Sequence, residues 1–276
     1  MEQKIKAADT LEESFILEIE KTLHLKIADA YPKQGSIHFL SFDYMQNLPL
    51  PHITSNVVFY SLQLWNNIFG VHNLGEDSAT VYHYCEREGK KGPNEVTPIL
   101  RDYINHNRED EINELVLTSD GCPSQNKNRT MMHFIYCLVH LLKLYDKVTY
   151  IFPVGGKKIT ISTELPVDWD SVICNAKKYP TPFSLRIIIY DDFKYMKAAT
   201  DPFFLKTLQV TLQLKETRVV QEVKGESTLS IKNTYSGQWT THIVRSRQPL
   251  VPYLEIPAFY QCNPGIKHAK ANDLAN

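Results

Sequence analysis

The chain has 276 residues, of which 43% are hydrophobic and 22% charged, an ordinary balance for a soluble globular protein. Thirty basic residues against 31 acidic ones leave a net charge of −1, which argues against a protein that wraps nucleic acid by its overall charge. The sequence shows no signal peptide and no apolar run of about 18 residues, so we expect no membrane association. Five cysteines without C-x-x-C spacing argue against a zinc finger or disulfide framework and favour a nuclear or cytoplasmic location.

The first part of the chain predicts a helical segment followed by three strands. Residues 1–30 have mixed apolar and charged residues at helical spacing. Residues 37–45 predict the first strand, and the proline-rich stretch 48–55 predicts an irregular connection. Residues 57–72 and 78–86, rich in β-branched and aromatic side chains, predict the second and third strands.

The central part alternates helices with strands. Residues 94–107 predict a helix, in which Pro98 must lie in the first turn. Residues 114–120 predict the fourth strand and residues 147–154 the fifth. Between them, residues 126–145 are almost continuously apolar, which predicts a helix buried on more than one face. Three strands, helix, strand, helix, strand is the order of the RNase H-like fold, in which the fourth strand lies parallel to and beside the first.

The remainder, residues 156–260, is less regular and predicts the end of this core with a C-terminal α+β subdomain of β-hairpins. Residues 167–178 predict a short helix and residues 184–190 a strand. Residues 206–244 alternate in polarity, as β-hairpins do. The polar residues 261–276 predict a flexible tail.

Two acidic residues mark the candidate site. Asp120 directly follows the apolar run ELVLT of the fourth strand, and Asp43 lies on the first strand. Open α/β proteins place their chemistry at the carboxyl ends of such strands. If the two strands are neighbours, the two carboxylates predict a metal-dependent phosphoryl-transfer site.

Five sequence blocks resemble a family of transposase-derived animal proteins that carry a domain of unknown function. In chain order the blocks are LSFDYMQNLPLP, FYSLQLWNNIFGVH, YHYCEREGKKGPNEV, LTSDGCPSQNKNR and YIFPVGG. The resemblance covers residues 36–155 closely and the following residues more weakly. It implies an α/β, RNase H-like core of the DDE/D transposase type, with a mixed sheet of three antiparallel strands followed by parallel strands and helices.

The resemblance also implies site residues, a cofactor and a partner. Enzymes of this type hold two Mg²⁺ or Mn²⁺ ions with three carboxylates, of which Asp43 would be the first and Asp120 the second. Gln125, Asn126 and Asn128 would cap the helix and order the turn, or contact the substrate. DNA is the expected substrate partner, and a homo-oligomer or a protein partner is compatible with the same fold.

The third carboxylate is missing from its expected place. In the family it lies on an acid-bearing stretch that here is shortened to FPVGGKKITISTELPVDWDSVI. Lys157 stands where the family has His and is a candidate substrate contact. Glu164 is the nearest substitute ligand, and Asp168 and Asp170 are weaker ones because they belong to the following helix.

Three functions follow from this pattern. The first is a transposase-derived domain, ancestrally a metal-dependent enzyme for DNA strand cleavage and transfer, whose activity is impaired by the missing carboxylate. The second is a domesticated scaffold that binds a nucleic acid or a protein without chemistry. The third is an active metal nuclease in which Glu164 has replaced the lost ligand.

A second group of potential metal ligands lies on the apolar helix. His133, Cys137 and His140 share one helix face at a spacing that zinc sites use. Their neighbours are so apolar that we interpret them as core residues with satisfied hydrogen bonds.

Overall fold

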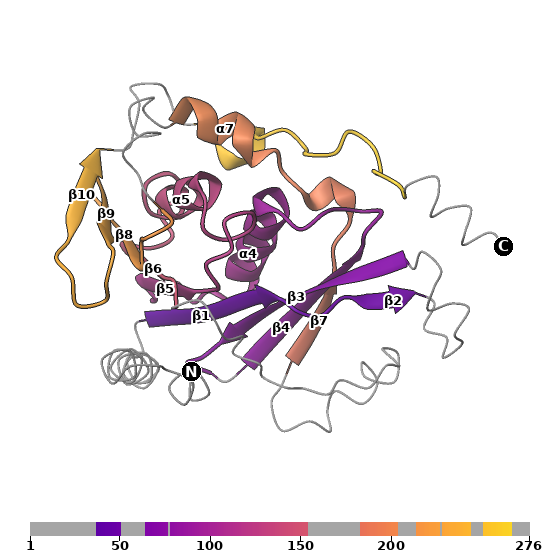
Figure 1. The fold of residues 1–276 in the computed structure, drawn as a ribbon, viewed down its shortest axis with the longest axis horizontal. Coiled ribbons are helices and arrows are strands. Elements are labelled where there is room, and N and C mark those ends of the chain that lie inside the picture. The colour runs from indigo at the N-terminus through magenta and orange to yellow at the C-terminus, as the bar shows by residue number, and fades with distance from the viewer. Residues whose placement is uncertain are drawn as a thin grey trace, which may run out of the picture.

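The computed structural model describes residues 37–50, 64–76, 78–153, 183–203, 214–226, 228–243 and 251–266. Ten strands of these residues form one mixed sheet, and the helices gather over one of its faces (Figure 1). The fold is therefore mixed α/β. No helix among the described residues is long and apolar enough to cross a membrane. The predicted helices within 1–30 and 167–178 lie outside the described residues, as do Lys157, Glu164, Asp168 and Asp170.

The centre of the sheet has the strand arrangement predicted from the sequence. The first three long strands, β1 (Ile37–Tyr44), β3 (Leu64–Asn73) and β4 (Ser78–Cys85), form an antiparallel meander. On the other side of β1 lies β5 (Glu114–Thr118), which runs parallel to it. Next comes β6 (Lys147–Ile151), parallel to β5. The predicted contact between the first and fourth long strands is therefore confirmed.

Two further strands pair with the antiparallel meander. A short strand, β2 (Leu48–Leu50), pairs antiparallel with β3, so the prediction of an irregular connection over 48–55 was wrong for its first residues. Pro49 is tolerated because β2 lies beside β3 alone and leaves its other edge unpaired among the described strands. The strand β7 (Phe183–Ile187) pairs parallel with β4 at the edge of the sheet.

The hairpin strands at the C-terminal end of the chain belong to the same sheet. They are β8 (Val219–Val223), β9 (Thr228–Lys232) and β10 (Thr240–Ile243), paired antiparallel in that order. Because β8 pairs with β6, these strands extend the central sheet at one end (Figure 1). Val220 and Leu229 are buried in the main core. The described hairpin strands therefore continue the core sheet, where the sequence predicted a subdomain.

The helix α4 (Pro93–Asn107) begins one residue earlier than predicted. Proline suits the first helical position, where an N–H has no intrahelical partner. Because the helix starts at Pro93, Pro98 lies in its second turn, where the sequence analysis had placed it in the first. Because Pro98 has no N–H, the helix lacks one intrahelical hydrogen bond. At the start of the helix, the Asn94 side chain accepts a hydrogen bond from Met196 N at 3.0 Å.

The second buried helix is shorter than the predicted span 126–145. It consists of α5 (Arg129–Tyr136) followed by one π-helical turn (Cys137–Leu141). Asn128 begins α5, because its side chain accepts a hydrogen bond from Met131 N. The helix ends where Lys143 adopts a positive φ of 53°, a left-handed conformation that helix C-termini use.

The last helices are short. They are the 3-10 turn η3 (Tyr190–Asp192), the helix α7 (Met196–Phe203) and the 3-10 turn η4 (Tyr253–Glu255). In η3, Asp192 accepts a hydrogen bond from the backbone N–H of Ile189 at 3.0 Å, so this acid caps the start of the turn.

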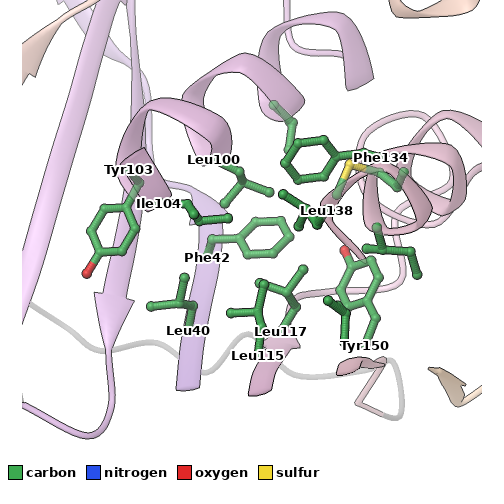
Figure 2. Packing of buried hydrophobic residues seen from close by; sticks show 14 of the residues in the cluster. Leu40, Phe42, Leu100, Tyr103, Ile104, Leu115, Leu117, Phe134, Leu138 and Tyr150 are labelled. Atoms are coloured by element: carbon green, nitrogen blue, oxygen red, sulfur yellow. The ribbon is translucent and has the colours of Figure 1, made fainter. Parts of the chain in front are cut away.

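The main core lies between the sheet and the helices (Figure 2). Its labelled members come from β1, β5, β6, α4, α5 and the π-helical turn: Leu40, Phe42, Leu100, Tyr103, Ile104, Leu115, Leu117, Phe134, Leu138 and Tyr150. A smaller cluster of Phe39, Val116, Ile151 and Val219 covers the opposite face. The central strands are therefore buried on both faces, which explains their nearly continuous apolar sequences.

Of the three residues at zinc-like spacing, His133 and Cys137 are core residues, as interpreted from the sequence, and His140 is partly buried. His133 and Cys137 are buried, and His133 Nε2 lies 3.4 Å from Cys137 Sγ. The other ring nitrogen of His133 lies 3.3 Å from Thr200 Oγ1. His140 faces β8, where its Nε2 lies 3.3 Å from a carboxylate oxygen of Glu222.

Glu222 is a buried acid whose protonation affects stability. Its side chain is fully buried, and Oε1 has no hydrogen-bond partner among the described residues. Burial raises the pKa of Glu222 from 4.5 to about 7, against the opposing effect of His140. The folded protein therefore keeps this proton at pH values where the unfolded chain has lost it.

Replacing Glu222 with glutamine is expected to stabilise the protein at alkaline pH. Because the folded pKa is raised, the free energy of unfolding falls as pH rises from 4.5 to about 7. Glu222→Gln removes this loss, so we expect a gain of about 3 kcal/mol near pH 8 and almost none near pH 4. Urea unfolding at both pH values measures this gain in the free energy of unfolding, with Glu216→Gln, at an exposed residue, as control. A gain independent of pH would contradict the assignment.

Candidate carboxylate site

The register of β1 and β5 brings Asp43 and Asp120 to the same edge of the sheet. The last paired residues of these parallel strands are Ser41 and Thr118. Asp43 lies two residues after Ser41, and Asp120 lies two residues after Thr118. Both residues are exposed. Asp43 is the next-to-last residue of β1 and Asp120 follows β5, so both lie where the carboxyl ends of the two strands meet, as the sequence predicted.

A buried tyrosine lies near both carboxylates. Tyr150, on β6, is fully buried. Burial is the main cause that raises its pKa, and the charges of Asp120 and Asp43 raise the pKa further. Both carboxylates therefore lie within electrostatic range of one phenol.

One oxygen of Asp120 is held by its own turn. Asp120 Oδ1 accepts hydrogen bonds from Asn126 Nδ2 at 2.6 Å and from Cys122 N at 3.2 Å. Asn126 is completely buried, so its amide has a fixed position. The second oxygen, Oδ2, accepts no hydrogen bond from the described residues. The turn thus holds the carboxylate in one orientation and leaves one oxygen available to a ligand.

The amides of the turn have structural roles. Asn128 caps α5 through Oδ1, and its Nδ2 donates to the carbonyl oxygens of Pro123 and Gln125 at 3.1 and 3.0 Å. Asn126 orients Asp120. The sequence left capping and substrate contact open as roles for these residues. Capping and ordering are confirmed for Asn126 and Asn128, while Gln125, whose side chain is partly exposed, remains a predicted substrate contact.

The hydroxyl of Tyr150 contacts the turn that holds Asp120. It lies 2.6 Å from Ser119 Oγ and 3.3 Å from the carbonyl oxygen of Asn126. It therefore contacts the residues on either side of Asp120 in the loop. The sequence analysis missed Tyr150, because an aromatic residue within an apolar strand resembles any other core residue.

Lys127 is a second residue that the sequence analysis missed. It is 5% exposed, its Nζ donates to the carbonyl oxygen of Lys215 at 3.0 Å, and it lies 5.0 Å from the centre of the Phe152 ring. Burial, together with the charge of Arg218, lowers the pKa of Lys127 to about 8. Lys127 thus connects the turn of Asp120 to the segment that precedes β8.

The described residues fit part of a two-metal site. Asp43 and Asp120 offer hard oxygen ligands at one edge, of the kind that Mg²⁺ and Mn²⁺ prefer. Among the described residues, no group of three or more His, Cys, Asp or Glu side chains is arranged to hold a metal ion. The predicted third ligand, Glu164, belongs to the part of the chain that the structure does not describe.

Fold and site together define a mixed α/β domain with a carboxylate pair where two parallel strands end. Comparison of the chain with protein-family models, with curated proteins and with solved structures finds no match in any of the three.

Removing the hydroxyl of Tyr150 is expected to destabilise the loop of Asp120. Tyr150→Phe leaves Ser119 Oγ without its closest partner, and we expect a loss of about 1–3 kcal/mol, as for a buried hydrogen bond. Urea unfolding measures the loss. The matched control is Tyr195→Phe, since the ring of Tyr195 stacks on Phe259 and its hydroxyl makes no hydrogen bond among the described residues. Equal stability of the two variants would show that the Tyr150 hydroxyl does not support the loop.

Proposed function

We propose that this chain is a transposase-derived, RNase H-like domain whose ancestral activity was metal-dependent cleavage and transfer of DNA strands. The observation that carries the proposal is the parallel pairing of β1 with β5, which places Asp43 and Asp120 at one edge. The antiparallel meander before this pair, and β6 parallel to β5 after it, agree with the strand order of that fold.

Asp43 and Asp120 would hold Mg²⁺ or Mn²⁺. In a two-metal site the ions stabilise the attacking and leaving oxygens of an in-line displacement at a phosphodiester. The contribution of this chain is to orient Asp120, because Asn126 and Cys122 donate to one carboxylate oxygen and the other accepts no hydrogen bond from the described residues.

In the proposed function, strand cleavage is impaired. The support is the shortened sequence between FPVGG and VDWDSVI, where the family that the sequence resembles carries the third carboxylate. Loss of one ligand weakens the hold on at least one of two ions. We therefore expect experiments to detect metal binding without strand cleavage.

The second candidate is a binding protein that holds a nucleic acid or a protein partner on the same fold without chemistry. It is favoured by large apolar side chains exposed beside the edge strand β7. Ile187 is 70% exposed and Ile189 47% exposed. A single exposed apolar residue is ordinary, but apolar residues along an edge strand favour a protein partner.

Manganese is expected to stabilise the folded protein through the carboxylate pair. Because a ligand that binds only the native state stabilises it, Mn²⁺ at about one hundred times its Kd should add about 2.7 kcal/mol. We expect a rise in the melting temperature of the wild type and no rise for Asp120→Asn or Asp43→Asn. Asp110→Asn is the control, since Asp110 is fully exposed and pairs with Arg108 away from the site.

The same proteins are tested for cleavage of labelled DNA in Mn²⁺. The proposal expects the wild type to cleave no faster than Asp120→Asn, despite binding the ion. Cleavage by the wild type that Asp120→Asn abolishes would instead establish the active nuclease, with Glu164 as the first residue to test. Equal melting temperatures with and without Mn²⁺ would refute the metal site.

A further inference from the structure

The turn between β4 and α4 carries two consecutive lysines, Lys90 and Lys91, beside the carboxylate site. We call residues 86–92 the lysine turn. Lys90 is exposed and Lys91 is partly buried. Neither was assigned a role by the sequence.

Buried tyrosines hold this turn against the sheet. The hydroxyl of Tyr84 donates a hydrogen bond to the carbonyl oxygen of Lys90. Tyr84 also shares a hydrogen bond of 2.7 Å with the hydroxyl of Tyr44. Because Tyr44 directly follows Asp43 on β1, the lysine turn is fixed relative to the first carboxylate.

A buried acid holds the same turn from the helix side. Glu95, on the first turn of α4, is 1% exposed and accepts hydrogen bonds from Lys90 N at 3.2 Å and from the hydroxyl of Tyr260 at 2.6 Å. Burial raises the pKa of Glu95, whereas its hydrogen bonds lower it. Since the Glu95 carboxylate is buried and its hydrogen bonds are made, the backbone of the turn has little freedom to move.

The C-terminal segment covers the lysine turn. The side chain of Asn263 donates to Glu88 Oε1 at 2.8 Å, and Gly265 N donates to the carbonyl oxygen of Arg87 at 3.1 Å. The described residues at the start of the predicted flexible tail therefore contact this turn.

Lys91 contacts Tyr44, the residue next to the first carboxylate. Its Nζ lies 4.8 Å from the centre of the Tyr44 ring, in cation–π contact. Burial lowers the pKa of Lys91, and the negative charge of Asp43 opposes that shift. The ammonium group is thus held in place by a ring on β1, within electrostatic range of Asp43.

A fixed cation at this position addresses an electrostatic difficulty of the site. A nucleic-acid strand is an anion, and Asp43 and Asp120 repel its phosphates. The net charge of the chain is −1, so overall charge supplies no attraction. A lysine already ordered on Tyr44 also loses less side-chain entropy on binding than a freely moving one.

We propose that Lys91 binds a backbone phosphate of a nucleic-acid strand that lies across the edge of Asp43 and Asp120, and that Tyr44 positions it. The inference rests on the proposed function, because it takes DNA as the partner of this site. It adds a specific substrate-binding residue outside the predicted set of Gln125, Asn126, Asn128 and Lys157.

Three variants of the full chain test the proposal through binding of fluorescently labelled duplex DNA over a series of salt concentrations. Lys91→Met removes the charge but keeps an apolar side chain against Tyr44. Lys91→Arg keeps the charge. Lys224→Met is the matched control, since Lys224 pairs with Asp146 at 2.6 Å, next to the opposite end of β6.

We expect Lys91→Met to weaken DNA binding about 3- to 10-fold at low salt and to reduce the slope of log K against log salt by about 0.9, as for one lost phosphate contact. Lys91→Arg should restore both values, and Lys224→Met should match the wild type. A lysine with a merely structural role would change melting temperature without changing the salt slope.

The proposal is overturned if Lys91→Met and Lys224→Met have equal affinities and salt slopes, or if the wild type binds no DNA. The proposed metal site is judged separately. Lys91→Met should keep the Mn²⁺-dependent rise in melting temperature that Asp120→Asn loses. The substitution removes a positive charge near Asp43, so it adds no repulsion against a bound Mn²⁺ ion. A wild type that shows the Mn²⁺ effect but binds no DNA thus refutes only the DNA role, and a wild type that binds DNA but shows no Mn²⁺ effect refutes only the metal site.

Discussion

The parallel pairing of β1 with β5 is the constraint on which the rest of the structure depends. The two strands lie at the centre of the sheet, with the helices over one face and a smaller apolar cluster on the other. A slip of one residue would exchange the buried and outward side chains of a whole strand, so the register is strongly determined. Leu40 pairs with Leu117 in this register, and the same register aligns Asp43 with Asp120. Core packing therefore sets the geometry of the candidate site.

Buried polar groups then fix the loops that lie at this edge. Asn126 holds one oxygen of Asp120, and Glu95 holds the backbone of the lysine turn. Each is almost completely removed from water, where an unpaired polar group is costly, so its hydrogen bonds determine one conformation of the loop. Asn126 Oδ1 and Glu222 Oε1 are both buried without a hydrogen-bond partner among the described residues. At Glu222, burial raises the pKa of the carboxyl.

The errors of sequence analysis have physical causes. The short strand β2 was missed because Pro49 and its neighbours resemble a loop, and only β3 beside them supplies hydrogen bonds. The helix over 126–145 was predicted too long because an apolar run does not show where the backbone turns, which happens at Lys143. The hairpin strands were assigned to a subdomain because alternation reveals strands but not the strand, β6, with which they pair.

The sequence by itself determined where the main strands and helices lie and which of their residues are apolar. Apolar periodicity located β1, β5 and α4, and the position of each acid after a strand selected Asp43 and Asp120. Only the tertiary structure decided which groups surround those acids. Tyr150 lies 30 residues beyond Asp120 in the chain, and Lys91 is 48 residues beyond Asp43. Their roles depend on contacts between distant segments, which strand pairing and core packing create and which local sequence patterns do not encode.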